Sequence, residues 1–167
     1  FSGAGVDLWA AQCNYALARV YRETGHIARA AETLQEARRT FRRYPILGLR
    51  ADAFLDTAVL ALRTGDLQRA LDYLDEAEPL YSRLQVHYLV AMCNVYRGET
   101  YAELDRYQLA LHYLELAHTR LRELDVPDRV AEAALRLGET WLWLQRPATA
   151  LAYLQEAAAY YEDAGHT

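Results

Sequence analysis

The stretch Gly65-Asp66-Leu67-Gln68-Arg69-Ala70-Leu71-Asp72-Tyr73-Leu74-Asp75-Glu76-Ala77 belongs to a pattern that recurs along the chain every 40 residues. Three of its positions keep the same residue type in all four copies: Ala30, Ala70, Ala110 and Ala150; Leu34, Leu74, Leu114 and Leu154; Ala37, Ala77, Ala117 and Ala157. A fixed period of this kind is typical of solenoid proteins, in which each unit packs only on its neighbours. We therefore predict four structural units, at about residues 7–45, 46–85, 86–125 and 126–165 of one domain that comprises residues 1–167.

Apolar residues within each unit have the spacing of an amphipathic helix. In the second unit they stand at Ala70, Leu74, Ala77, Tyr81 and Leu84, with steps of 4, 3, 4 and 3 residues. The pattern predicts two helices per unit, joined by tight turns. The first helices are expected at 7–24, 46–64, 86–104 and 127–144, and the second helices at 26–44, 66–84, 106–124 and 147–164.

Two local features modify this expectation. Residues 1–5 resemble a linker, and Pro79 lies inside the second helix of the second unit. Because proline lacks the backbone donor and its ring clashes with the preceding turn, we expect a kink there or an earlier helix end.

Composition sets the broad class of the protein. The chain has 167 residues, 53% of them hydrophobic, which is enough to form an ordinary core. Its net charge is -5, and all 18 basic residues are arginines, so no global field favours nucleic acid. The longest uncharged run, 84–96, is too short to cross a bilayer of about 30 Å. No signal peptide is visible, and Phe1 is not an initiator Met, so we expect a fragment of a longer cytoplasmic protein.

The two cysteines, Cys13 and Cys93, occupy the same repeat position two units apart. Stacked helices lie about 8–10 Å apart, so this separation should exceed the roughly 7 Å between Cα atoms that a disulfide can bridge. We therefore expect both thiols to be reduced, buried and poorly reactive, as suits a cytoplasmic protein.

The spacing of small and large residues resembles the tetratricopeptide repeat. The fourth unit carries the pattern at Leu137-Gly138, Trp141, Ala150, Leu154 and Ala157. The chain departs from the family in its period, which is 40 residues rather than about 34, and Ala61 replaces the aromatic residue of the first helix in the second unit. The resemblance implies an all-α solenoid of αα-hairpins, wound as a right-handed superhelix. Units of this length are similar to those of large bacterial signalling proteins, which would make the chain an interaction or regulatory module.

No catalytic arrangement is recognisable in the sequence. His112 and His118 are six residues apart, which places them on different faces of a helix, and neither forms a metal-binding pair with a nearby cysteine. No glycine-rich phosphate loop is present. We therefore predict a protein that is not an enzyme, with no cofactor and no metal site.

A basic cluster comprises Arg38, Arg39, Arg42, Arg43 and Arg50. It could bind an anion or nucleic acid. It could equally be the solvated end of a helix, where cations complement the dipole. We favour the second interpretation, because the chain is acidic and no aromatic residues are interleaved for stacking on bases.

In tetratricopeptide superhelices, the first helix of each unit lines the concave side. By this resemblance, we predict a groove that binds an apolar or amphipathic segment, from a protein partner, a peptide or the parent chain. The predicted contact residues are Leu55, Val59, Leu62, Val95, Tyr96, Glu99, Leu135, Glu139, Leu142 and Trp143.

Three alternatives remain at this point. The apolar members of the groove could instead be contacts between neighbouring helices. The outer face of the last helix, with Tyr160 and Tyr161, could support self-association into a homo-oligomer. The chain could also be the ligand-sensing region of a bacterial transcriptional regulator. No membrane role is expected.

Overall fold

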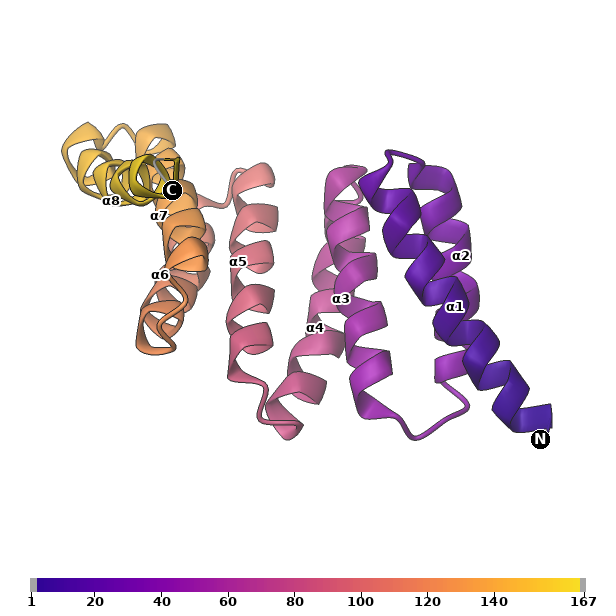
Figure 1. Cartoon of the computed structure of the whole chain (residues 1–167). Helices are drawn as coiled ribbons and strands as arrows, with labels where there is room; N and C mark the ends of the chain where they lie inside the picture. The colour runs from indigo at the N-terminus through magenta and orange to yellow at the C-terminus, as the bar shows by residue number, and fades with distance from the viewer. Residues whose placement is uncertain (1–2, 166–167) are drawn as a thin grey trace. The chain divides into compact units, whose positions relative to one another are not determined.

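The computed structural model describes residues 3–165, which form helices and no strand (Figure 1). The helices are α1 (Gly3–Glu23), α2 (Ile27–Phe41), α3 (Leu47–Arg63), α4 (Leu67–Arg83), α5 (His87–Glu103), α6 (Tyr107–Glu123), α7 (Pro127–Trp143) and α8 (Pro147–Gly165). They form consecutive pairs in which the two helices pack along each other: α1 with α2, α3 with α4, α5 with α6, and α7 with α8. The predicted all-α solenoid of helical hairpins is thus confirmed.

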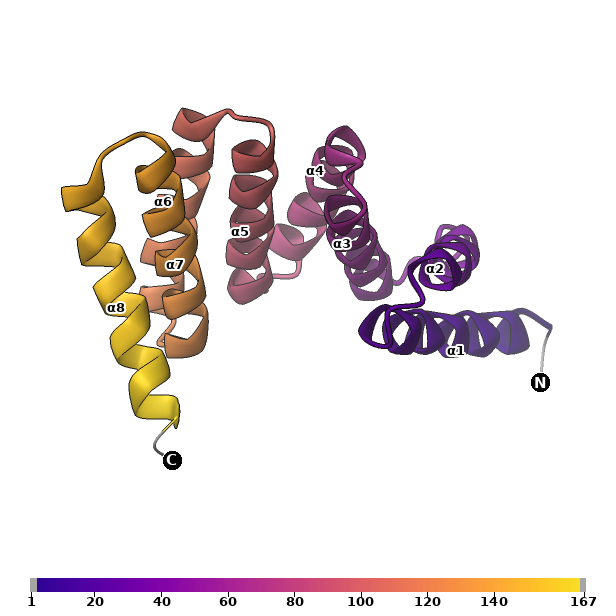
Figure 2. The same ribbon diagram turned by 90° about the horizontal axis from the view of Figure 1, so that it is seen from above.

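The pairs fall into two compact halves. The first half ends at Val86 and contains α1–α4, and the second half begins at His87 and contains α5–α8. Figure 2 shows α5, α6, α7 and α8 alongside one another, and successive helices of this half pack on each other. Below, the first helix of each pair is called an A helix and the second a B helix. No helix within residues 3–165 combines the length and the apolar character needed to span a membrane.

Most helix ends lie within a residue of the prediction, and two do not. Helix α1 begins at Gly3 rather than Asp7, so residues 3–5 are helical and the expected linker is wrong there; residues 1–2 lie outside the described part. Helix α2 ends at Phe41 rather than Tyr44. The cause is Pro45, because the same repeat position in the next two units is a left-handed residue, with φ of 56° at Gln85 and 55° at Asp125. Proline is restricted to φ near -65°, so this turn must be built differently.

The turns inside the pairs also use left-handed residues. Gly65 has a φ of 77°, and the backbone N–H of Asp66 donates to the carbonyl of Ala61 at 2.9 Å, which closes the end of α3. The corresponding residues of the second half, Asp105 and Gln145, adopt φ of 57° although they carry a Cβ. The same turn therefore forms with glycine in one half and without it in the other.

Helix α4 continues through Pro79 to Arg83, so the expected earlier end is wrong. Pro79 is exposed, and its ring therefore displaces no packed side chain. The kink at this point stays a prediction.

The core is built from the repeated positions of the B helices. In α2, Ala30, Leu34, Ala37 and Phe41 are at most 3% exposed, and the equivalent residues of α4 and α6 are buried as well. In α8 the pattern is incomplete, because Tyr161, at the position of Phe41, is 48% exposed. The described residues provide no helix beyond α8 to cover that face.

The two cysteines differ, contrary to expectation. Cys93 is buried, but Cys13 is exposed, and both are free thiols. The same position in α3 is Ala53, which is buried in a core cluster with Leu34, Ala37 and Phe41 of α2. This position therefore faces the preceding B helix, and α1 has none among the described residues.

Candidate interaction surface

The A helices of each half contact one another directly: α1 packs on α3, and α5 packs on α7. Within each half, the residues expected on the inner surface thus lie on two A helices that are in contact. In the first half, the side chains of this surface form a polar network. In the second half, they form a row of ion pairs, and an exposed apolar patch lies at the end of α7.

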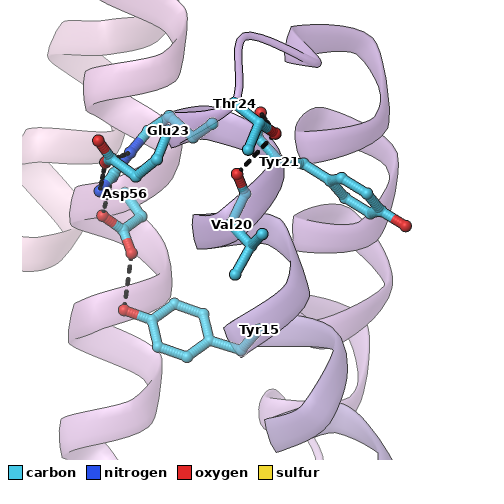
Figure 3. Close-up of polar contacts among 7 residues, drawn as sticks. Tyr15, Val20, Tyr21, Glu23, Thr24 and Asp56 are labelled. Carbon is cyan, nitrogen blue, oxygen red and sulfur yellow. Dashed lines mark hydrogen bonds and ion pairs between the residues drawn. The ribbon is translucent and has the colours of Figure 1, made fainter.

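In the first half, polar contacts converge on the carboxylate of Asp56 in α3. The hydroxyl of Tyr15 donates to Asp56 Oδ2 at 2.7 Å, and Arg22 Nη1 donates to Oδ1 at 2.5 Å (Figure 3). Arg22 also pairs with Glu23 at 3.0 Å. Directly after the end of α1, Thr24 Oγ1 donates to the carbonyl of Val20 at 2.9 Å. The network joins α1 to α3 and leaves the Asp56 carboxylate fully engaged.

Burial and charge shape the acidity of this network. Burial, and then the charge of Asp56, raises the pKa of Tyr15 well above its usual value, so the phenol stays a neutral donor. Burial also raises the pKa of Asp52, although the hydroxyl of Tyr81, which donates to Asp52 Oδ1 at 2.8 Å, opposes the shift. Each phenol thus serves as a hydrogen-bond donor to a carboxylate, Tyr15 to Asp56 and Tyr81 to Asp52.

In the second half, the corresponding centre is a guanidinium. Arg136 Nε in α7 donates to Glu99 Oε1 in α5 at 2.6 Å, and Arg136 Nη1 lies 3.0 Å from Glu139 Oε2. Nearer the start of α7, Arg129 Nη1 lies 2.7 Å from Glu132 Oε2. Burial raises the pKa of Glu99, and Arg136 offsets only part of that shift. The acidic residues of this face are thus largely paired with arginines of α7.

The predicted contact residues occupy three different environments. Val59 and Val95 are 9% and 0% exposed, so they are not available to a partner; Val95 belongs to a core cluster with Met92 and Leu121. Leu142 and Trp143 are 49% and 70% exposed. The others are half-buried: Leu55, Leu62, Tyr96, Glu99, Leu135 and Glu139.

An aromatic pair stands at the end of α7. The ring of Trp143 stacks on Tyr107 of α6, with centroids 6.5 Å apart and planes inclined by 7°. The hydroxyl of Tyr107 donates to Asp105 at 2.7 Å. Sequence reasoning did not include Tyr107, although antiparallel packing of α6 and α7 brings the start of one helix beside the end of the other. Trp143, Leu142 and Tyr107 are called the aromatic patch below.

The basic cluster is split by the structure. The guanidinium of Arg38 lies 4.2 Å from the ring centroid of Tyr73 and 5.3 Å from that of Phe54, so this residue packs α2 against the next pair. Arg39, Arg42 and Arg43 are exposed at the end of α2 and just beyond it. This arrangement agrees with a solvated helix end for those three residues.

Within residues 3–165, no group of histidine, cysteine or carboxylate side chains has the arrangement of a metal site. His118 instead lies with Nε2 3.1 Å from Glu156, which also pairs with Arg122. These contacts join α6 to α8.

Comparison with known proteins agrees with this architecture. Residues 15–84 match the sequence profile of the tetratricopeptide repeat. This segment belongs to the tetratricopeptide repeat family. The second half continues the same 40-residue period and the same helical pairing. No curated protein matches the sequence of the chain.

Several solved structures share the tetratricopeptide fold of the chain. The apo form of RapI aligns with a TM-score of 0.87 at 18% identity, over 95% of this chain and 58% of its own. Aspartyl phosphate phosphatase F from Bacillus subtilis aligns with a TM-score of 0.87 at 13% identity, over 98% and 43%. The Rap conjugation gene regulator of plasmid pLS20, in complex with the Phr* peptide, gives 0.80 at 15%, over 93% and 43%. The chain thus spans about half the length of these proteins, and the likeness concerns the fold.

Proposed function

We propose that the chain is a non-catalytic interaction module that binds a helix or an extended segment of a partner through its A helices. The observation that carries the proposal is the aromatic patch, in which Trp143 is 70% exposed and Leu142 is 49% exposed. A large aromatic ring held in place by stacking is the kind of anchor on which binding energy concentrates.

The structural relatives support a peptide ligand. One of them, a conjugation gene regulator, was solved with the Phr* peptide bound. Because its identity to this chain is 15%, it shares the fold, and peptide binding by the present chain rests on the surface itself.

The chemistry of the partner follows from the surface of α5 and α7. An apolar anchor would cover Trp143 and Leu142, and a basic residue would lie near Glu139, whose side chain is 46% exposed. Glu99 contributes little to such a charge contact, because it is 16% exposed and bound to Arg136. We propose that the charges set the rate of association and its salt dependence, and that the apolar anchor sets the affinity.

We further propose that the module acts inside a larger bacterial cytoplasmic signalling protein, with its ligand supplied by another protein or by the parent chain. Reduced thiols at Cys13 and Cys93 accord with that compartment.

For the test, a partner is recovered by affinity capture, and its binding segment is then synthesised as a peptide. Trp143→Ala is expected to weaken binding about 30-fold, which corresponds to about 2 kcal/mol. Leu116→Ala is the control, because Leu116 of α6 is 48% exposed and lies outside this patch. Circular dichroism should show unchanged helicity in both variants.

Two results would contradict the proposal. Equal binding by wild type and Trp143→Ala would remove the aromatic patch from the interface. If replacement of Arg39 and Arg43 abolished binding instead, the basic end of α2 would be the interface.

A further inference from the structure

Helix α1 carries an apolar stripe along its whole length, called the α1 stripe below. Val6, Trp9, Leu17 and Val20 are 56%, 65%, 45% and 55% exposed, and Cys13, which lies between them, is exposed as well. The steps of 3, 4, 4 and 3 residues place all five on one face of the helix. None of these residues belongs to the A-helix surface discussed above.

The same face is covered in the other A helices. At the position of Cys13, Ala53 of α3 and Ala133 of α7 are 0% exposed, and each lies in a core cluster with the preceding B helix. At the position of Leu17, Leu137 of α7 is 0% exposed and packs on Leu111 and Leu114 of α6. The α1 stripe is therefore the surface on which this fold seats a B helix.

We propose that the α1 stripe is a docking site for one amphipathic helix with the chemistry of a B helix, which packs on α1 as α6 packs on α7. Such a helix has small and large apolar residues in steps of four, three and four. In α6 these are Ala110, Leu114, Ala117 and Leu121.

Charge adds a second requirement on the occupant. In the second half, Arg122 and His118 of α6 both contact Glu156 of α8. Arg122 directly follows the apolar residue Leu121, and His118 directly follows Ala117. Glu36 of α2 stands at the repeat position of Glu156 and is exposed, with a contact to Asn14 at 3.5 Å. A helix docked on α1 therefore gains an ion pair if a basic residue follows its last apolar position.

A second copy of this chain does not meet that requirement. Its uncovered B helix is α8, whose residues at the positions of His118 and Arg122 are Ala158 and Glu162. Docking through α8 would place Glu162 opposite Glu36, and two like charges repel. The occupant is thus a helix with a cation at that position.

The experiment uses a synthetic peptide with the sequence of residues 106–125, which contains α6. Binding is followed by the rate at which a neutral maleimide labels Cys13, which lies in the centre of the stripe. Buried Cys93 is the internal reference. At saturating peptide, the labelling rate of Cys13 is expected to fall at least fivefold, and that of Cys93 to stay unchanged. An isolated peptide of this length is marginally helical, so concentrations up to the millimolar range are used.

Matched variants test both parts of the proposal. Leu17→Asp should abolish the protection of Cys13, whereas Arg19→Ser, at an exposed residue on another face of α1, should leave it intact. A peptide with Arg122→Glu should bind several-fold more weakly, and Glu36→Arg in the protein should restore its binding.

Three outcomes would overturn the inference. The first is an unchanged labelling rate at every peptide concentration. The second is protection that persists in Leu17→Asp. The third is protection that appears without peptide when the protein is concentrated and disappears in Tyr161→Asp, which would make the occupant a second copy. Trp143→Ala should have no effect on the labelling of Cys13. A failure of the α1 docking site can therefore be distinguished from a failure of the proposed function, which depends on Trp143.

Discussion

Asp56 and Arg136 occupy the same repeat position in the two halves, and they carry opposite charges. Asp56 gathers Tyr15 and Arg22 from the neighbouring A helix, whereas Arg136 gathers Glu99 from α5 and Glu139 from its own helix. The apolar positions of the two halves are nearly the same, and the fold is the same. Packing of small and large residues therefore determines the architecture, and the charges between A helices can invert without changing it.

A second difference concerns how closely the helices of a pair approach. Ala18 and Ala58 of the first half correspond to Gly98 and Gly138 of the second. A Cβ on Gly98 would lie 2.5 Å from Leu114 Cγ and 3.1 Å from the carbonyl oxygen of Ala110. The two pairs of the second half thus use the absence of a side chain, where the first half accommodates a methyl group.

The largest expected effect tests what the halves share. Leu74→Ala and Leu114→Ala should each lower the free energy of unfolding by about 2–5 kcal/mol, because both side chains are 0% exposed and truncation leaves a cavity. Leu154→Ala, at the same position but half-buried, should cost less. Urea denaturation measures all three, and a negligible loss at Leu114 would show that the register is wrong in the second half.

Gly98→Ala tests what the halves do not share. The added methyl group should push Leu114 from its place and cost about 1–3 kcal/mol, reduced by up to about 1 kcal/mol because alanine favours the helix. The reciprocal change, Ala58→Gly, should cost about 1 kcal/mol through the loss of helix propensity, and more through the loss of a buried methyl group. A stabilised Gly98→Ala variant, measured by thermal unfolding, would mean that the α5–α6 pair has room at this contact.

Tyr15→Phe removes the hydrogen bond from the Tyr15 hydroxyl to Asp56 Oδ2. We expect a loss of about 1.5 kcal/mol at neutral pH, at the low end for a hydrogen bond to a charged group, because Arg22 still holds Asp56. Burial raises the pKa of Tyr15 in the folded state above the unfolded value near 10. The tyrosine therefore stabilises the fold below about pH 10, and this contribution is lost as the pH rises further.

The pH profile distinguishes this account from simple loss of packing. Urea denaturation of wild type and Tyr15→Phe at pH 7.5 and 10.5 should show a smaller difference between the two proteins at the higher pH. A difference that stays constant would remove Tyr15 ionisation from the explanation.

The smallest effect is expected at Cys13. Cys13→Ser should change the free energy of unfolding by less than about 0.5 kcal/mol, because the side chain is exposed. Cys93→Ser buries a hydroxyl at a 0% exposed site and should cost about 1–3 kcal/mol. Chemical denaturation of the two variants checks the contrast, and equal losses would place Cys13 in a buried site.

The sequence by itself determined the period, the helical pairs and the buried positions of the B helices. These follow from local rules, since an apolar residue every three or four positions specifies one face of a helix. Because the repeat is strict, every helical pair has small and large residues at the same positions and packs in the same way. The exposed end of α7, with Leu142 and Trp143, was also predictable, because those residues lie outside the apolar positions shared by the units.

Only the tertiary structure decided which equivalent positions differ. Cys13 and Cys93 are identical by sequence position, yet one is exposed and the other buried, because burial depends on whether a neighbouring helix is present. Val95 is buried at a position where Leu55 and Leu135 are half-buried. The choice of Asp56 and Arg136 as opposite centres likewise depends on which long side chains reach across from the adjacent A helix, and a one-dimensional pattern does not contain those distances.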